Sequence, residues 1–338
     1  MKDLPLSVLD QSPIIGETSP REAVMKTIEL ARLADRLGFH RYWCAEHHSL
    51  RGLADASPEI LLARLGAETK GIRLGTGGIM MPYYAPFKIA EQFRMLEALY
   101  PGRIDLGLGR APGGQQSTAR VLYDGRNPDT EEGFVNQLSE LSAIFRGIVP
   151  EGHPLKGEIA NPAVETMPEM WVLGSSSGGA SFAAHLGMRY AFAHFINAHS
   201  GAEVAKAYRA NFRPWHEEKP RVALAMLAIC TRDEAEAAAV EKAVMMRWAA
   251  TAMGQNRPVP TVAEAAAREM TSTEMRIAAR DKPRATIGTP DFVERRIREV
   301  AEEFGADEVI LTAMAPEYEL RTFTLNQLAP RFGLEPRA

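Results

Sequence analysis

The chain has 338 residues, of which 46% are hydrophobic and 24% charged, a composition typical of a folded globular protein. Its formal net charge is −4 and both signs are interspersed, so the sequence lacks the basic face of a nucleic-acid-binding protein. There is no apolar run of the roughly 18 residues needed to cross a bilayer, no signal core, and only two cysteines, Cys44 and Cys230. We therefore expect a cytoplasmic protein with reduced thiols, and neither nucleic acid nor membrane as a partner.

Strand-like and helix-like segments alternate along the whole chain. The first expected helix shows the pattern clearly, because Thr18 and Ser19 are candidate caps before it, Pro20 suits its first turn and Gly38 follows it. In chain order, the expected strands are 4–9, 41–45, 73–80, 104–108, 171–173, 190–193, 221–230 and 308–312. The expected helices are 20–37, 57–70, 87–99, 130–145, 178–186, 202–212, 235–253, 290–304 and 317–328.

Eight strands that alternate with helices predict a parallel sheet, and the number eight favours closure into a (β/α)8 TIM barrel. We expect a single domain over residues 1–338. Two insertions interrupt the alternation, at about 111–129 after the fourth strand and about 254–288 after the seventh. The second contains a helical patch at 262–280. Insertions of this length in a compact domain are often lids or binding loops.

Two adjacent histidines, His47 and His48, follow the second expected strand in the run Ala-Glu-His-His at 45–48. Active sites of barrels lie at the carboxyl ends of the strands, and an imidazole there can act as a general acid or base. Successive residues point to opposite faces, so at most one of the two can face the mouth of the barrel. The alternatives are one packed and one solvated histidine, or a metal site, which no further ligand cluster completes; we expect no metal.

Glycines interrupt the third strand, where the sequence is Gly-Thr-Gly-Gly at 75–78. Glycine weakens a strand unless the backbone must come close to another group, and a planar ring stacked on Gly77 and Gly78 is such a group. A bulge at the rim of the barrel is the other explanation.

Two elements suited to an anion follow neighbouring strands. Arg110 follows Gly-Leu-Gly at 107–109, and a guanidinium group there can hold a phosphate through two hydrogen bonds, although it could equally form a surface ion pair. Ser175, Ser176 and Ser177 connect the fifth strand to its helix, whose free N–H groups attract anions, although serine is also an ordinary helix cap. His194, after the sixth strand, could line the same mouth and bind the cofactor, or it could be structural. Together these strand ends suggest a barrel enzyme that uses a flavin.

The chain resembles the bacterial luciferase-like monooxygenases, most strongly over its first 200 residues. The motifs that carry the resemblance are Gln-Ser-Pro at 11–13, Tyr-Trp-Cys-Ala-Glu-His-His at 42–48, Leu-Gly-Thr-Gly-Gly-Ile-Met-Met-Pro at 74–82, Gly-Arg-Ile-Asp-Leu-Gly-Leu-Gly-Arg at 102–110 and Trp-Val-Leu-Gly-Ser-Ser at 171–176.

The resemblance implies a barrel that binds reduced FMN from a separate NAD(P)H:flavin reductase and uses O2 to oxygenate a small organic substrate. It implies catalysis by His47, a cis peptide between Gly77 and Gly78 beneath the flavin ring, and phosphate binding by Arg110 and Ser176. The resemblance also implies a homodimer. Helix 87–99 could serve as its interface, or it could pack only on its own barrel.

Two other functions share this site. One is hydride transfer with the deazaflavin F420, and the other is a flavin-binding protein without turnover. The chain departs from luciferase itself at Gly109, Ser175 and His194, so light emission from a long-chain aldehyde is not expected.

Overall fold

The computed structural model describes residues 4–124 and 130–337. Nine parallel strands lie within them, and eight close into a barrel in the order β1-β2-β3-β4-β5-β6-β7-β9, with β9 pairing to β1. The predicted (β/α)8 barrel is therefore confirmed. The strands are β1 (Leu6–Asp10), β2 (Arg41–Cys44), β3 (Arg73–Met80), β4 (Ile104–Gly109), β5 (Glu169–Gly174), β6 (Arg189–Ala193), β7 (Val222–Cys230), β8 (Ala285–Gly288) and β9 (Glu308–Thr312).

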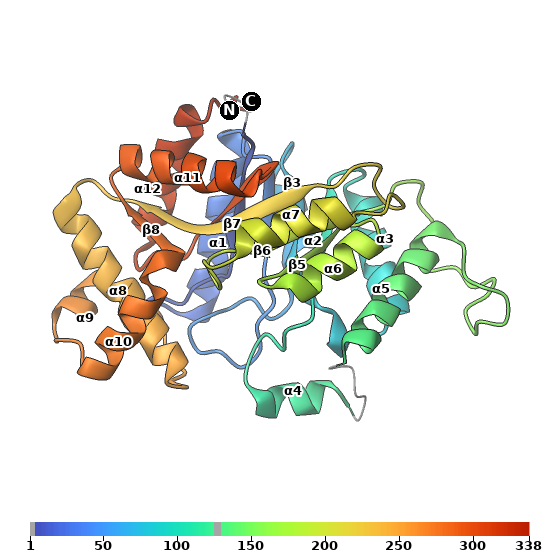
Figure 1. Ribbon diagram of the computed structural model, residues 1–338, viewed down its shortest axis with the longest axis horizontal. Helices are drawn as coiled ribbons and strands as arrows, with labels where there is room; N and C mark the ends of the chain where they lie inside the picture. Colours follow the sequence, from blue (N-terminus) through green and yellow to red (C-terminus); the bar gives the residue numbers. More distant parts are fainter. Residues whose placement is uncertain (1–3, 125–129, 338) are drawn as a thin grey trace.

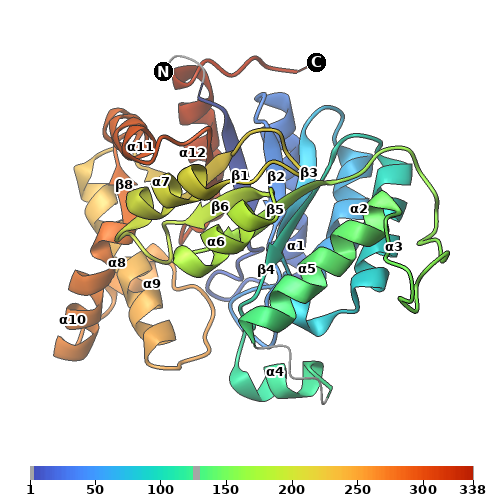
Figure 2. The ribbon, with the colours of Figure 1, turned by 45° about the vertical axis from the view of Figure 1, so that its right-hand side comes forward.

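Helices surround the barrel (Figures 1 and 2). Helix α1 begins as its sequence predicts, because the side chain of Ser19 accepts a hydrogen bond from the N–H of Glu22 at 3.2 Å. The helices are α1 (Pro20–Arg36), α2 (Pro58–Glu68), α3 (Pro86–Leu99), α4 (Gln116–Leu122), α5 (Glu131–Arg146), α6 (Ser177–His185), α7 (Gly201–Asn211), α8 (Glu234–Ala252), α9 (Val262–Ala266), α10 (Ser272–Asp281), α11 (Pro290–Phe304) and α12 (Tyr318–Arg331), with short 3-10 turns η1 (Met81–Tyr83) and η2 (Lys282–Arg284).

The two insertions contain more regular structure than the sequence predicts. The insertion at 111–129 contains α4, and its last five residues lie outside the described residues. The helical patch at 262–280 divides into α9 and α10, which lie beside α8 in both views (Figures 1 and 2). Strand β8 was not predicted. It pairs with the last four residues of β7, which extend beyond the part of β7 that pairs with β6, and four residues are too few to show a hydrophobic period.

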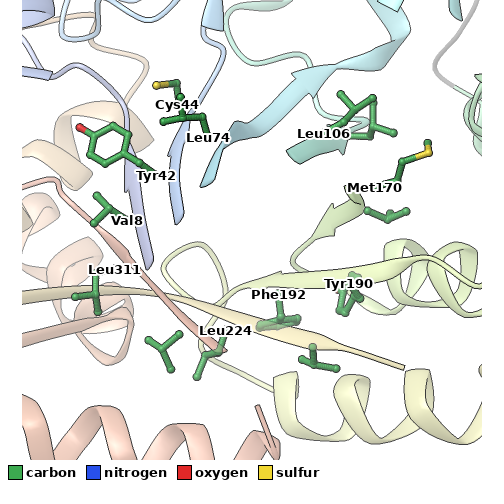
Figure 3. Packing of buried hydrophobic residues seen from close by; sticks show 14 of the residues in the cluster. Val8, Tyr42, Cys44, Leu74, Leu106, Met170, Tyr190, Phe192, Leu224 and Leu311 are labelled. Atoms are coloured by element: carbon green, nitrogen blue, oxygen red, sulfur yellow. The ribbon is translucent and has the colours of Figure 1, made fainter. Parts of the chain in front are cut away.

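The core has an outer layer between strands and helices, and Figure 3 shows side chains of this layer on successive strands. A second layer fills the barrel itself, where the rings of Trp43 and Trp171 meet edge to face with centroids 5.4 Å apart. Two residues further along their strands, the inward positions are occupied by the smaller Ala45 and Leu173. This change from large to small side chains leaves space at the carboxyl ends of the strands.

Charged residues close the opposite end of the barrel. Arg41, the first residue of β2, is buried and pairs with Asp105 at 2.9 Å, Glu169 at 2.8 Å and Glu308 at 2.8 Å. Burial alone would lower the pKa of Arg41, but the charges of Asp105 and Glu308 outweigh it and raise that pKa. Because these acids lie on β4, β5 and β9, the guanidinium group ties four strands together.

Candidate functional site

A cavity of about 810 Å³ opens at the carboxyl ends of the barrel strands. Its volume suits a cofactor together with a small substrate. Small side chains form part of its floor, among them Ala45, Ala191, Ala193 and Ala225. Polar and charged groups reach it from the loops and from α8.

Both insertions form walls of this cavity. Residues 111–115 line it, and the N–H of His48 donates to the carbonyl of Gly113 at 2.8 Å. Residues 254–257 also line it, and the side chain of Asn256 donates to the carbonyl of Ser49 and accepts from the N–H of Arg51, both at 2.6 Å. The insertion after β7 therefore lies bonded to the loop that follows β2.

His47 lines the cavity and is held by a buried carboxylate. Its Nδ1 lies 2.8 Å from Oδ2 of Asp55, which accepts the Nδ1–H and leaves Nε2 as the free ring nitrogen. Burial raises the pKa of Asp55, while the neighbouring His47 opposes this shift. A histidine whose Nδ1–H is held by a carboxylate has a fixed orientation and tautomer, which suits it to act as a general acid or base through Nε2.

His48 has a different environment and does not line the cavity. Its Nε2 donates to Oε1 of the buried Glu46 at 2.7 Å. Glu46 also accepts from the hydroxyl of Tyr84 and from the N–H of Met80, each at 2.8 Å. His48 thus helps to fix the end of β2 against the segment after β3, and we do not retain it as a catalytic residue.

The peptide bond between Gly77 and Gly78 is cis, as the family resemblance implies. The register of β3 against β4 also shifts between Thr76 and Ile79. A bulge at this point, the other explanation for the glycines, is therefore compatible with the structure as well. A Cβ on Gly78 would lie 2.7 Å from the backbone carbonyl oxygen of Gly107, so close packing within the barrel accounts for glycine there. Both glycines line the cavity and present bare backbone to it.

Arg110 and the serine segment lie on the same cavity. Arg110 lines it and also pairs with Glu131, the first residue of α5, at 3.2 Å, so both interpretations of this arginine are compatible with the structure. Ser175 and Ser176 line the cavity just before α6. Their carbonyls accept hydrogen bonds from Nδ2 of Asn197 at 2.9 Å and from the hydroxyl of Tyr190 at 3.1 Å. No described residue hydrogen-bonds to the two serine hydroxyls.

Two residues assigned to cofactor binding lie elsewhere. Ser177 is exposed as the first residue of α6 and does not line the cavity. His194 is buried with its ring 6.0 Å from that of Phe304, whereas its neighbours Ala193 and Phe195 line the cavity. Alternation along the chain therefore places His194 on the outer face, and we do not retain it as a cofactor ligand.

We expect His194 to make stability depend on pH. Burial lowers its pKa from 6.5 to about 4. The stability that the neutral His194 contributes to the folded protein is therefore fully present above pH 6.5 and is lost as the pH falls toward 4. Urea unfolding of the parent and of His194→Leu at pH 7 and pH 5 checks this. The free energy of unfolding of His194→Leu, relative to that of the parent, should be about 2 kcal/mol higher at pH 5 than at pH 7. An unchanged difference between the two proteins would show that His194 does not titrate in this way.

Sequence reasoning missed three groups at this site. Asp55 lies in an irregular loop eight residues after His47, where no spacing rule would select it. Thr312, at the end of β9, lines the cavity with a buried hydroxyl oxygen that has no hydrogen-bond partner among the described residues. Arg247 lines the cavity from α8. The sequence contains a signal for it, because Arg247 is the one charged residue in the stretch 243–254.

Two further properties limit the classes of site. Within residues 4–124 and 130–337, no group of three or more His, Cys, Asp or Glu side chains is arranged to hold a metal ion. Over the same residues, no helix combines the length and apolarity that crossing a membrane would require.

The fold and the cavity thus define a (β/α)8-barrel protein with a large cavity at the mouth of the barrel. The family model for luciferase-like monooxygenases matches residues 6–308. The chain belongs to this family.

Curated and solved proteins are similar to most or nearly all of this chain. Uncharacterized protein YceB of Bacillus subtilis is 38% identical over 328 residues, which are 97% of this chain and 99% of YceB. An N-acetyl-S-alkylcysteine monooxygenase of the same organism is 40% identical over 235 residues, 68% of this chain and 70% of that protein. The crystal structure of apo-MsnO8 superimposes with a TM-score of 0.90 at 36% identity, over 99% of this chain and all of the other.

More distant structures share the fold. They include the oxygenating constituent of 3,6-diketocamphane monooxygenase from Pseudomonas putida in complex with FMN, with a TM-score of 0.69 at 16% identity over 99% of this chain and 100% of that one. An F420-dependent secondary alcohol dehydrogenase has the same TM-score at 14% identity, over 98% of this chain and 99% of the other.

Proposed function

We propose that this protein is the oxygenating component of a two-component monooxygenase. It would receive reduced FMN from an NAD(P)H:flavin reductase. The observation that carries the proposal is that one cavity holds both His47, oriented by Asp55, and the pair of Arg110 and the serine segment. The first group suits proton transfer and the second suits a phosphate.

The residues present fit FMN. Arg110, Ser175 and Ser176 would hold the phosphate, and the bare backbone of Gly77 and Gly78 would lie against the ring. The unpartnered hydroxyl of Thr312 supplies a further polar group on the cavity wall. When bound, the reduced flavin supplies the electron pair that activates O2.

The overall reaction places one oxygen atom in the substrate and releases the other as water. His47 would hold or release a proton at Nε2, because Asp55 occupies Nδ1. The two insertions would limit the access of water to the cavity, which protects reactive species. We take an N-acetyl-S-alkylcysteine as the first substrate to test, because a relative is named for that activity.

Anaerobic titration with reduced FMN and with reduced F420 tests the choice of cofactor. The proposal predicts saturable binding of reduced FMN and weaker binding of F420. Preference for F420 would favour hydride transfer, and tight FMN binding without product from any tested substrate would favour a flavin-binding protein without turnover.

Arg110→Gln should weaken binding of reduced FMN about 10-fold to 100-fold, because a charge-assisted hydrogen bond to phosphate contributes about 1.5–3 kcal/mol. The same titration measures this loss. Arg120→Gln, at an exposed position on α4, is the matched control and should bind as the parent protein does. Parent-like binding by Arg110→Gln would mean that Arg110 serves only its ion pair with Glu131.

We also propose that the protein forms a homodimer through α3. Met95 and Leu99 of this helix are half exposed, at 51% and 52%, as expected of a face that a partner could cover.

A further inference from the structure

Arg247 projects from the helix that follows β7 into the cavity. Val244, Trp248 and Thr251 line the cavity with it, and their spacing of three to four residues defines one face of α8. Apolar side chains of other elements complete this part of the cavity, among them Leu53, Val259 and Met314. A charged group on this face is therefore unusual for its surroundings.

The other arginines that line the cavity have an ion-pair partner or are exposed to water. Arg247 has no ion-pair partner within the described part of the chain and is only partly exposed. Arg110 pairs with Glu131, and Arg284 pairs with Asp281 at 2.7 Å and stacks on Trp248 at 4.3 Å. Arg257 is exposed. Arg247 is only partly exposed, and no described residue hydrogen-bonds to its guanidinium group or forms an ion pair with it.

The electrostatic environment of Arg247 agrees with this geometry. Burial lowers its pKa to about 10, and the charge of Asp55 opposes that shift only in part. A cation that loses water without gaining a partner destabilises the free protein. A bound anion would supply the missing partner.

The position of Arg247 separates it from the proposed phosphate site. In the ring of eight barrel strands, β7 lies opposite β3, which carries Gly77 and Gly78, while Arg110 and the serine segment follow β4 and β5. An anion at Arg247 therefore approaches from the side of the mouth opposite the proposed ring site. The influence of Asp55 on Arg247 also places it within electrostatic reach of the carboxylate that orients His47.

We propose that Arg247 binds the carboxylate of an organic substrate whose apolar remainder lies along the α8 face of the cavity. A guanidinium group can hold a carboxylate through two parallel hydrogen bonds. The inference rests on the proposed function, because it assigns the substrate end of the same cavity.

Calorimetric titration of the flavin-free protein tests this assignment without turnover. The probes are N-acetyl-S-benzylcysteine and octanoate, each compared with its own primary amide, which has the same shape without the charge. The parent protein should bind at least one acid about 10-fold to 100-fold more tightly than its amide. Arg247→Gln should abolish this preference, and Arg247→Lys should retain part of it.

Arg257→Gln is the matched control, since Arg257 lines the same cavity but is exposed. It should keep the preference for the acid. The thermal midpoint of Arg247→Gln should equal or exceed that of the parent, because the substitution removes an unpaired charge. A preference that survives in Arg247→Gln, or equal binding of acids and amides by the parent, overturns the proposal.

Titration of Arg247→Gln with reduced FMN separates this proposal from the proposed function. FMN binding should match that of the parent. Weaker FMN binding with an intact acid preference would make Arg247 a flavin contact and overturn the proposal. If the parent itself does not bind reduced FMN, the proposed function fails, and the acid and amide titrations still decide the role of Arg247.

Discussion

Replacing His47 by glutamine is expected to lower the oxygenation rate by about 10²-fold to 10⁴-fold, the usual contribution of a positioned acid or base. Glutamine keeps most of the side-chain volume but cannot hold and release a proton at Nε2. Binding of reduced FMN should change by less than about 3-fold, because His47 is not among the proposed phosphate contacts. Product formed from an N-acetyl-S-alkylcysteine, with a reductase supplying the flavin, measures the rate.

Two further variants distinguish proton transfer from a merely structural role of His47. Asp55→Asn should also slow the reaction and shift its pH profile, because a neutral amide no longer fixes the same form of the ring. His48→Gln should keep a rate near that of the parent while losing thermal stability, since His48 contacts Glu46 and not the cavity. A fast His47→Gln enzyme would remove His47 from the mechanism.

Replacing Arg41 by methionine should lower the free energy of unfolding by about 3–5 kcal/mol, because buried carboxylates lose the charge that compensates them. Urea unfolding of both proteins gives this difference. The affinity of folded Arg41→Met for reduced FMN should be unchanged, because Arg41 lies at the end of the barrel opposite the cavity.

Arg296→Met provides the comparison for that loss. Arg296 pairs with Glu299 at 2.5 Å on the surface, with both side chains nearly half exposed, so its loss should cost less than about 1 kcal/mol. Equal effects of the two substitutions would mean that the cluster around Arg41 contributes no more than a surface pair.

Much of the fold follows from the sequence, because barrel strands and their helices have strong local signals. Strand β3 and helix α11 have the predicted bounds, 73–80 and 290–304. The short β8 escapes prediction, since its pairing depends on the extra length of β7. That dependence is tertiary and leaves no pattern within residues 285–288 themselves.

The sequence predicts which strand ends form the site, but not which individual side chains at those ends face the cavity. The sequence brings His47, Arg110 and the serine segment to one mouth because carboxyl ends of barrel strands meet there. Whether His47 or His48, or Ala193 or His194, faces the cavity depends on alternation over a single residue. Asp55 reaches His47 only through the path of an irregular loop, which no periodicity encodes.

The most direct test of the proposed function is the reaction of protein-bound reduced FMN with O2. The protein is saturated anaerobically with reduced FMN and mixed rapidly with oxygenated buffer, and the return of oxidised-flavin absorbance is followed. We predict that this return is much slower than for free reduced FMN, and that Arg110→Gln largely restores the fast rate at the same flavin concentration. A return as fast as that of free reduced FMN, at saturating parent protein, would contradict a cavity that holds the reduced flavin and shields its reaction with oxygen.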